Sequence, residues 1–538
     1  MSTQGPEMLV RISAAHGRWS GTRAVLAPWA WPALLAAAVW LGLFYNLGAI
    51  PLFDVDEGAF GEATREMLAR GDYVSTWLNG QPRFDKPILI YWLQAASVRL
   101  FGLDEFALRL PSALAAAAWI AAIHAFTRRV LDGATARAAA FIAATSAGVV
   151  VIGRGAIADA LLNLFLALAL FDVYRELVDP RPRWRRRACF WIALGMLTKG
   201  PVALLIPAAA GALAFGLQGR MREWWHAARD PVGWLILLAV AGPWYALEYA
   251  ARGDAFLAGF FMRHNVERFL VPLQGHAGSP LFYLLALLLL VLPYTGLLLA
   301  TLPGVRRLRA SPLDTLLWCW FLFVLGFFTL AGTKLPHYLL YGATPLFILM
   351  ARRRDVLRSR VAALGPALAL VSTVAALPLM LRHAAPGARN AYVREALSRD
   401  GVFGPAWHAQ ALALLACVLV LALWPGRSPA ARPWPRLVAA ALACSYAVGG
   451  LLLPAAAELQ QGPVKRAALL ARQAGWPVRS WRINVPSFSV YRAAVTPATD
   501  VPRPGDVILT RSDALDGLPV PARVLYREGG VLLVRIDG

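Results

Sequence analysis

The sequence predicts a multi-pass α-helical membrane protein that ends in a small α/β domain. Of its 538 residues, 58% are hydrophobic and only 16% are charged, and the mean hydropathy is +0.54. The apolar residues form long blocks such as 281–302 and 313–331, and roughly 20 apolar helical residues cross a bilayer core. The arginines cluster between these blocks, as they do in cytoplasmic loops.

The blocks predict about 13 membrane spans, and this number fits the charge pattern. If the N-terminus, with Arg11, Arg18 and Arg23, is a cytoplasmic tail before an uncleaved first span, each arginine cluster falls in a cytoplasmic loop. The chain after residue 454 then emerges on the outer side. The predicted spans are 28–50, 108–127, 137–152, 158–174, 188–199, 201–218, 232–250, 281–302, 313–331, 338–350, 361–380, 406–424 and 437–454.

The net charge of +22 does not indicate a nucleic-acid partner. The clusters that carry it explain topology and contact with anionic membrane lipids, and we expect no nucleic acid to bind. The four cysteines all lie within apolar segments, so we interpret them as core residues and not as disulfides or metal ligands.

Two domains follow from this topology. Residues 1–454 form the transmembrane domain, and its outer loops, in which we look for functional residues, are 51–107, 153–159, 251–280 and 332–338. Residues 455–538 lack long apolar runs and form a periplasmic α/β domain. It contains a helix at 463–474 and strands near 478–483, 507–510 and 531–536.

The first outer loop opens with three carboxylates, those of Asp54, Asp56 and Glu57. An amphipathic helix is predicted to start just after them and to lie on the outer membrane surface. For Glu57 alone, a helix cap is an equally good explanation. Three carboxylates within four residues favour a general base or a ligand for a divalent cation.

Lysine is rare in this chain, and its placement is informative. Only four of the 53 basic residues are lysines, and Lys86, Lys199 and Lys334 each lie beside proline-containing segments at a predicted outer boundary. Snorkelling lysines at helix ends are one explanation. We favour a second one, because a compact ammonium group is a good partner for a phosphate.

Two further outer segments carry polar side chains. Asp159 begins a predicted span, and the 251–280 loop contains Arg263, His264 and Arg268. A lone histidine is more often a structural hydrogen-bonding group than a ligand. The sequence contains no Walker loop, dinucleotide fingerprint, nucleophile elbow or paired zinc motif, which argues against soluble nucleotide chemistry.

Six short motifs, taken together, carry a family resemblance. The chain resembles the GT-C glycosyltransferases of the protein O-mannosyltransferase superfamily, and most of all the bacterial aminoarabinose transferase-like branch that modifies lipid A. The motifs begin at Asp56 (DEGAFGE), Phe84 (FDKP, then YWLQ), Arg154 (RG, then Asp159), Leu197 (LTKGP), Arg263 (RHNVERF) and Thr333 (TKLPHY).

The resemblance implies a GT-C fold with outer-face juxtamembrane helices in the bacterial inner membrane, with an active site that faces the periplasm. It implies inverting transfer of a sugar from a polyprenyl (undecaprenyl) phosphate donor. By the same resemblance Asp56 is the candidate base, and Asp159 and Glu57 are further catalytic acids. The candidate donor-phosphate residues are Lys86, Arg268, Lys334 and Tyr338.

Two departures from that branch bear on metal binding and on specificity. The chain has Asp85 where the branch has glutamate, and Asn265 beside His264 where it has histidine. Whether a divalent metal ion is a cofactor is therefore open, with Asp85 and His264 as the candidate ligands. The sugar is open as well, and so is the acceptor, which could be a glycolipid such as lipid A, a protein or another glycan.

Two other classes of protein are less consistent with the sequence. A transporter or flippase of lipid-linked sugars would carry charges inside its spans and inverted repeats, whereas the charges here lie in outer loops. A scaffold protein with an outer interaction domain would not need Asp56, Lys86 and Asp159 together.

Overall fold

Helices dominate the computed structural model, which describes residues 30–271, 278–279, 281–425, 433–518 and 520–537. The predicted cytoplasmic tail, with Arg11, Arg18 and Arg23, lies outside the described residues. The same holds for the start of the 28–50 span, for part of the 251–280 loop and for most of the arginine cluster after residue 426.

Between the first and the last predicted span, the described chain is a series of helices joined by short turns. The α-helices are α1 (Ala30–Val39), α2 (Asp56–Arg70), α3 (Leu89–Phe101), α4 (Glu105–Val130), α5 (Gly133–Thr145), α6 (Ala147–Ile152), α7 (Asp159–Val178), α8 (Pro182–Lys199), α9 (Val202–Leu217), α10 (Met221–Ala228), α11 (Pro231–Arg252), α12 (Asp254–Phe256), α13 (Arg268–Leu270), α14 (Phe282–Leu290), α15 (Thr295–Thr301), α16 (Pro312–Leu330), α17 (Ala343–Arg353), α18 (Arg360–Ala384), α19 (Ala391–Leu397), α20 (Pro405–Leu423) and α21 (Trp434–Tyr446).

Segments of other helical types extend several of these α-helices. A π-helical segment, η1 (Trp40–Phe44), continues α1, and another, η2 (Leu257–Glu267), joins α12 to α13. A 3₁₀ segment, η4 (Pro336–Gly342), leads into α17.

Every predicted span overlaps a helix of the structure, although the number of membrane crossings is not confirmed. Six helices among the described residues are long and apolar enough to cross a membrane, and a seventh crossing results if α14 and α15, bent by 117°, form one span. Several other predicted spans correspond to short helices or to helices with arginines in their first turns, such as α8. The count of 13 therefore stays a prediction.

Small side chains allow the helices of the core to approach one another closely. α5 consists largely of alanine, and its residues 138–144 are buried almost completely. This helix packs against both α4 and α17. Because lipid tails are as apolar as leucine, close van der Waals packing between such small-residue faces is what holds helices together in a bilayer.

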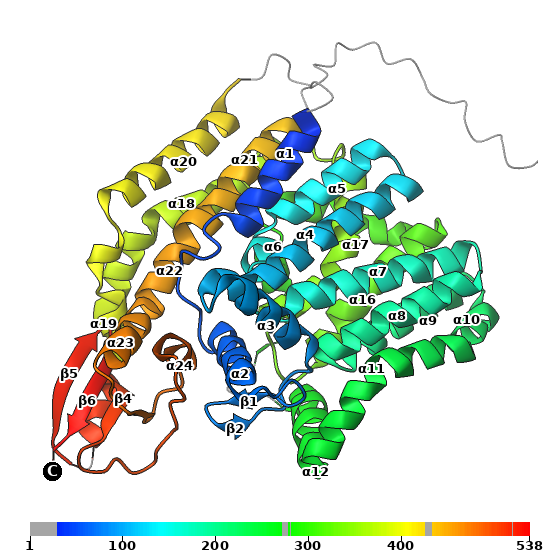
Figure 1. Cartoon of the computed structure of the whole chain (residues 1–538). Helices are drawn as coiled ribbons and strands as arrows, with labels where there is room; N and C mark the ends of the chain where they lie inside the picture. Colours follow the sequence, from blue (N-terminus) through cyan, green and yellow to red (C-terminus); the bar gives the residue numbers. More distant parts are fainter. Residues whose placement is uncertain (1–29, 272–277, 280, 426–432, 519, 538) are drawn as a thin grey trace, which may run out of the picture.

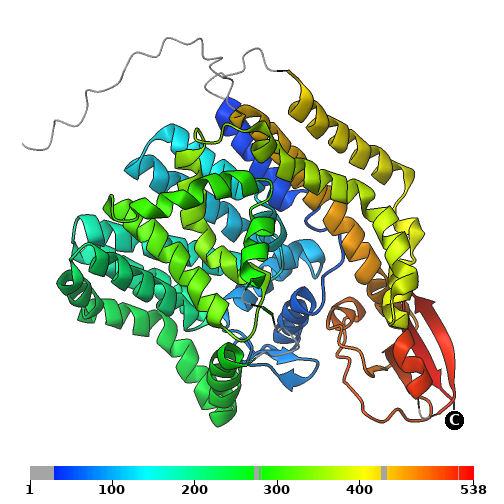
Figure 2. The same cartoon turned by 180° about the vertical axis from the view of Figure 1, so that it is seen from behind.

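The outer segments gather at one end of the helix bundle. α2, the hairpin β1 (Trp77–Leu78) and β2 (Gln81–Pro82), α12 and the C-terminal domain all lie toward the bottom of Figure 1, and Figure 2 shows the same grouping from behind. The predicted position of α2 on the outer membrane surface stays a prediction, but the helix is not exposed. Most of its residues are buried, because it packs between α3 and the C-terminal domain.

The C-terminal domain combines short helices with one mixed sheet, as predicted. Its strands lie in the order β3-β4-β6-β5, with β3 parallel to β4 and the other pairs antiparallel. The prediction did not include β5, an edge strand with arginines on its exposed positions. The elements are α22 (Leu453–Gln460), α23 (Gly462–Gln473), β3 (Val478–Ser480), α24 (Ser487–Arg492), β4 (Val507–Arg511), β5 (Ala522–Glu528) and β6 (Val531–Ile536).

The last membrane helix and the C-terminal domain are continuous. The helical segment that begins with α21 runs without a break from Trp434 to Gln460, past the predicted domain boundary at 454/455. That boundary stays a prediction, and the continuous helix connects the domain directly to the bundle.

Candidate active site

Asp56 lies in the first turn of α2, with an exposed side chain. None of the residues that the structure describes forms a hydrogen bond or an ion pair with its carboxylate. Its charge nevertheless acts electrostatically on Arg83, His337 and Tyr338. Asp56 is therefore an exposed carboxylate whose charge acts on Arg83 and on two residues of the motif that begins at Thr333.

The neighbouring carboxylate of Glu57 has a different environment. Arg109 donates to both of its oxygens, at 2.8 Å and 2.6 Å, and the backbone N–H groups of Phe53 and Ala156 donate at 2.9 Å and 2.7 Å. Burial would raise the pKa of Glu57, but the Arg109 charge and these hydrogen bonds hold it below the usual value. This geometry favours a structural role for Glu57 over the predicted catalytic one, because all of its acceptor positions are in use.

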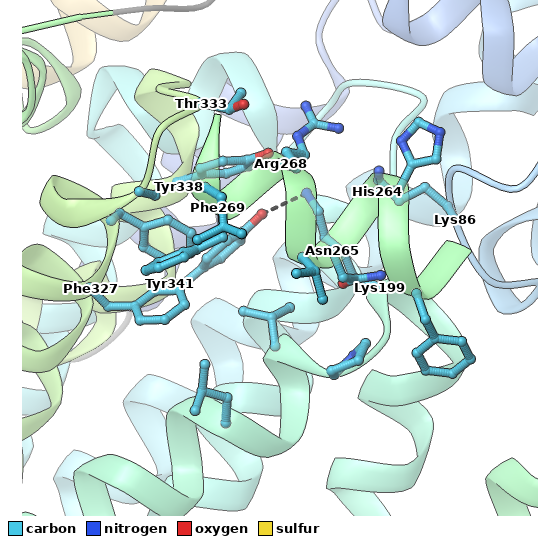
Figure 3. Close-up of a pocket in the computed structure, with 18 of the residues that line it drawn as sticks. Lys86, Lys199, His264, Asn265, Arg268, Phe269, Phe327, Thr333, Tyr338 and Tyr341 are labelled. Carbon is cyan, nitrogen blue, oxygen red and sulfur yellow. Dashed lines mark hydrogen bonds between the residues drawn. The ribbon is translucent and has the colours of Figure 1, made fainter. Parts of the chain in front are cut away.

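Cations and aromatic rings line a cavity of about 430 Å³, and one of these rings is that of Tyr338, on which the Asp56 charge acts. Lys86, Lys199 and Arg268 lie on one side, and Phe327, Tyr338 and Tyr341 lie on the other (Figure 3). The remaining apolar lining comes from α9, α13 and α16 and includes Leu205, Leu270 and Phe328. Of these, Leu205 and Leu270 are 38% and 67% exposed on the outside of the bundle.

Lys86 is a cation without an ion-pair partner among the described residues. Its Nζ donates only to the backbone oxygen of Asp85, at 2.9 Å. Burial, together with repulsion from Arg268 and Lys199, lowers the pKa of Lys86 to about 7. A bound anion would relieve this repulsion and raise the pKa again.

Arg268 lies on the same side of the cavity as Lys86 and also lacks a carboxylate partner among the described residues. It interacts with Tyr338, and its Nε is buried without a hydrogen-bond partner in the described part of the chain. Backbone hydrogen bonds attach its helix to the next motif, since Thr333 N donates to Arg268 O at 3.3 Å. The motifs around residues 268 and 333 therefore form one wall of the cavity.

The carboxylate of Asp159, in contrast, has several close partners, all at one of its oxygens. Its Oδ1 accepts hydrogen bonds from Lys199 Nζ at 2.7 Å and from the Tyr341 hydroxyl at 2.6 Å, and His337 Nε2 lies 3.6 Å away. Lys199 also donates to Tyr341 at 2.6 Å, the contact drawn as a dashed line in Figure 3. The site prediction did not name His337 or Tyr341, although both belong to, or directly follow, the motif that begins at Thr333.

Lys334 does not line the cavity. Its Nζ donates to the backbone oxygens of Thr329 and Ala331, at 2.9 Å and 3.0 Å, and lies 5.6 Å from the ring centroid of Tyr283. These carbonyls belong to the unsatisfied C-terminal end of α16, where a cation is stabilising. The geometry thus favours a helix-capping role for Lys334 over the predicted contact with the donor phosphate.

The two candidate metal ligands bind each other. His264 Nε2 lies 2.7 Å from Asp85 Oδ1, and Arg83 lies 3.3 Å from Asp85 Oδ2. Burial opposes ionisation, yet His264, Arg83 and Lys86 hold the pKa of Asp85 far below its usual range. The described residues include no group of three His, Cys, Asp or Glu side chains that could hold a metal ion. Asp85 and His264 therefore fit a salt bridge better than a metal site.

A second cavity, of about 470 Å³, contains none of the predicted site residues. It lies among α7, α8, α9, α10 and α11 and is lined mainly by apolar and tryptophan side chains. Its charged groups are Arg185, Arg229, Glu176 and Asp230, two of each sign. The second cavity therefore has no excess of cations. The first cavity does, and it can hold an anion.

Known proteins resemble this chain in sequence and in fold. A family model described as dolichyl-phosphate-mannose-protein mannosyltransferase matches residues 85–246. The undecaprenyl phosphate-alpha-4-amino-4-deoxy-L-arabinose arabinosyl transferase 2 of Pseudomonas fluorescens is 30% identical over 77% of this chain and 70% of its own length. The corresponding transferase of Serratia proteamaculans is 31% identical over 62% of this chain, which spans only 61% of that relative.

Solved structures share the fold at lower identity. The crystal structure of ArnT from Cupriavidus metallidurans bound to undecaprenyl phosphate matches with a TM-score of 0.78 at 20% identity and covers 94% of this chain and 98% of that one. Its apo structure matches with a TM-score of 0.75, also at 20% identity, and covers 94% of this chain and 97% of that one.

The 30% identity to a named glycosyltransferase over 77% of this chain, together with the match to the mannosyltransferase model, defines an integral-membrane glycosyltransferase of the GT-C class. Within this class, the chain belongs to the family of the undecaprenyl phosphate-aminoarabinose arabinosyl transferases. The family assigned by resemblance from the six sequence motifs is thereby confirmed.

Proposed function

We propose that this chain transfers a sugar from a polyprenyl-phosphate donor to an acceptor at the periplasmic face of the bacterial inner membrane. The observation that carries the proposal is one cavity in which two cations without ion-pair partners among the described residues, Lys86 and Arg268, face an apolar aromatic wall. A phosphate with a hydrocarbon tail has the same two kinds of surface.

Lys86 and Arg268 bind the donor phosphate in this proposal, with the Tyr338 hydroxyl beside Arg268. As the bond between the sugar and the phosphate breaks, negative charge accumulates on the phosphate oxygens. Fixed cations in a site with little water stabilise that charge more in the transition state than in the bound substrate. The loss of one such group in other enzymes slows turnover by about 10²–10³-fold.

Asp56 acts as the general base in this proposal. Its carboxylate is exposed and has no partner among the described residues, so it can accept the proton of an acceptor hydroxyl. Asp159 fits that role less well, because it is buried and its Oδ1 already accepts hydrogen bonds from Lys199 and Tyr341. We assign Asp159 to the orientation of Lys199 and Tyr341 on the floor of the cavity.

The names of the relatives support aminoarabinose as the sugar and undecaprenyl phosphate as its carrier. Lipid A is proposed as the acceptor because the chain resembles the branch that modifies lipid A. A second candidate is O-glycosylation of a protein or another glycan, favoured by the match of residues 85–246 to a protein mannosyltransferase model. The two candidates share the donor phosphate site and differ only in the sugar and the acceptor.

The test is transfer by the purified protein in proteoliposomes that contain undecaprenyl-phosphate-aminoarabinose and lipid A, followed by mass spectrometry of both lipids. We expect lipid A to gain aminoarabinose, and Asp56→Asn to slow this by about 10²-fold or more. Asp254→Asn is the matched control, since Asp254 is also an exposed carboxylate in the first turn of an outer helix. Full activity of Asp56→Asn would refute its role as base. If lipid A stayed unmodified while envelope proteins added to the same proteoliposomes gained a sugar, the second candidate would replace the first.

A further inference from the structure

The C-terminal domain binds the acidic loop two residues before Asp56. The backbone N–H of Ser487, in α24, donates to Asp54 Oδ1 at 2.9 Å, and the Ser487 hydroxyl donates to Asp54 Oδ2. With its amide oriented to satisfy both of its ends, Gln461 donates to Asp54 Oδ2 at 2.9 Å and accepts from Asp54 N at 3.1 Å. Asp54 thus has partners from α24 and from the turn between α22 and α23.

Gly58 is what allows this contact to be so close. A Cβ atom at this position would lie 2.0 Å from Asp54 Oδ1 and 2.5 Å from Ser487 N, distances that real Cβ atoms do not show. Since a backbone nitrogen cannot move aside as a flexible side chain can, any larger residue would push α24 away from the loop. The glycine is needed for the approach of the two domains and not for its backbone angles.

A second contact holds the other end of the same loop. Leu52 N donates to the Tyr491 hydroxyl at 2.7 Å, and Tyr491, also in α24, donates to Glu105 Oε1 at 3.0 Å. On the far side, the Glu57–Arg109 ion pair attaches the loop to α4. The segment 52–57 is therefore fixed at three points, two of which belong to α24.

Asp56 is the one carboxylate of this loop that has no hydrogen bond or ion pair with the described residues. Nothing in its own side-chain contacts determines where it lies relative to the cavity. Its position follows from the backbone on either side, which Asp54 and Glu57 hold. A carboxylate that must reach a substrate proton depends on such support, because a displacement of about 1 Å can cost about 10²-fold in rate.

We propose that Ser487 is a positioning residue for catalysis: through Asp54 it holds the acidic loop so that Asp56 faces the cavity. The C-terminal domain is then part of the catalytic apparatus and not only a periplasmic appendage. This inference rests on the proposed function, because it takes Asp56 to be the base.

The test compares Ser487→Ala with Ser489→Ala in the full-length protein. Ser489 lies in the same helix, but its hydroxyl donates to Asn79 Oδ1 at 2.6 Å and does not contact the acidic loop. We expect Ser487→Ala to lower kcat about 10-fold or more without changing the KM for the donor. Ser487→Thr, which keeps the hydroxyl, should restore kcat, and Ser489→Ala should leave it unchanged.

Hydrogen–deuterium exchange of the 52–58 amides provides a readout that does not depend on catalysis. Faster exchange in Ser487→Ala, but not in Ser489→Ala, would support the proposal together with the loss of kcat. Unchanged exchange would overturn it, and so would faster exchange with normal kcat. If Asp56→Asn were fully active, Asp56 would not be the base, and the positioning role would fail while the proposed sugar transfer stood; normal kcat in Ser487→Ala beside an inactive Asp56→Asn would refute the positioning role alone.

Discussion

Lys199 and Asp159 form an ion pair on the floor of the cavity, with 2.7 Å between Nζ and Oδ1. The pair neutralises one of the three cations that line the cavity and leaves Lys86 and Arg268 without a carboxylate partner in the described part of the chain. Lys199 is therefore paired with a carboxylate, whereas the charges of Lys86 and Arg268 remain for a bound anion.

Lys86 makes donor binding depend on pH. Burial and neighbouring cations lower its pKa to about 7, so the free enzyme loses this charge as the pH rises through about 7. A donor phosphodiester has no proton to lose in this range, and it binds the protonated amine more tightly. We therefore expect the KM for the donor to rise between pH 7 and 9.

Lys86→Arg is the control for this prediction, because a guanidinium stays protonated throughout that range. The variant should show a KM that varies much less with pH, whatever its absolute value. Donor KM measured in proteoliposomes at several pH values provides the check. Equal pH profiles for the two proteins would refute the role of Lys86.

The Asp159–Lys199 pair should behave as a unit. Asp159→Asn or Lys199→Met alone leaves a buried charge without its partner, and breaking a buried pair in this way costs about 3–5 kcal/mol. The double variant removes both charges, so its loss of stability should be smaller than the sum of the two single losses. Thermal unfolding of the four proteins in one detergent measures this, and strict additivity would contradict a direct interaction.

Glu57 and Asp56 are adjacent, but we expect loss of the charge of Glu57 to lower stability and loss of the charge of Asp56 to lower activity. Glu57→Gln breaks the buried pair with Arg109 and should lower the free energy of unfolding by about 3–5 kcal/mol. Asp56→Asn should lower kcat and leave the unfolding temperature nearly unchanged, since its carboxylate is exposed. Measurement of both quantities for both variants separates the roles; a stable but inactive Glu57→Gln would restore Glu57 as a catalytic candidate.

Lys334→Met should affect stability and not donor binding. The ammonium group caps α16 through two backbone carbonyls, and its loss should cost about 1 kcal/mol. The KM for the donor should stay within twofold of the wild-type value, whereas Lys86→Met should raise it about 10-fold or more. A large rise in KM for Lys334→Met would place this residue in the donor site after all.

Local sequence patterns predicted much of the fold and part of the site. The apolar blocks predicted the helices, and strand patterns predicted β3, β4 and β6. β5 was missed because it is an edge strand whose arginines interrupt the apolar pattern. The placement of Lys86 and Arg268 along one cavity agrees with the motifs, although their roles stay proposals.

Partners that are distant in the chain could not be predicted in this way. Lys199 and Lys334 have similar local sequences, a lysine followed within two residues by proline, yet one pairs with Asp159 and the other caps α16. Which of the two occurs depends on the helix packed against each lysine. The contact between Asp54 and Ser487 spans 433 positions, and no local pattern indicates it.

The cavity has a consequence for the kind of lipid that this enzyme can use. Its volume of about 430 Å³ holds a phosphate, a sugar and at most a few isoprene units, and exposed side chains such as Leu205 and Leu270 border it on the side of the bilayer. We therefore expect the rest of the tail to stay among the lipids, so that a donor shortened to its first isoprene units still binds this cavity.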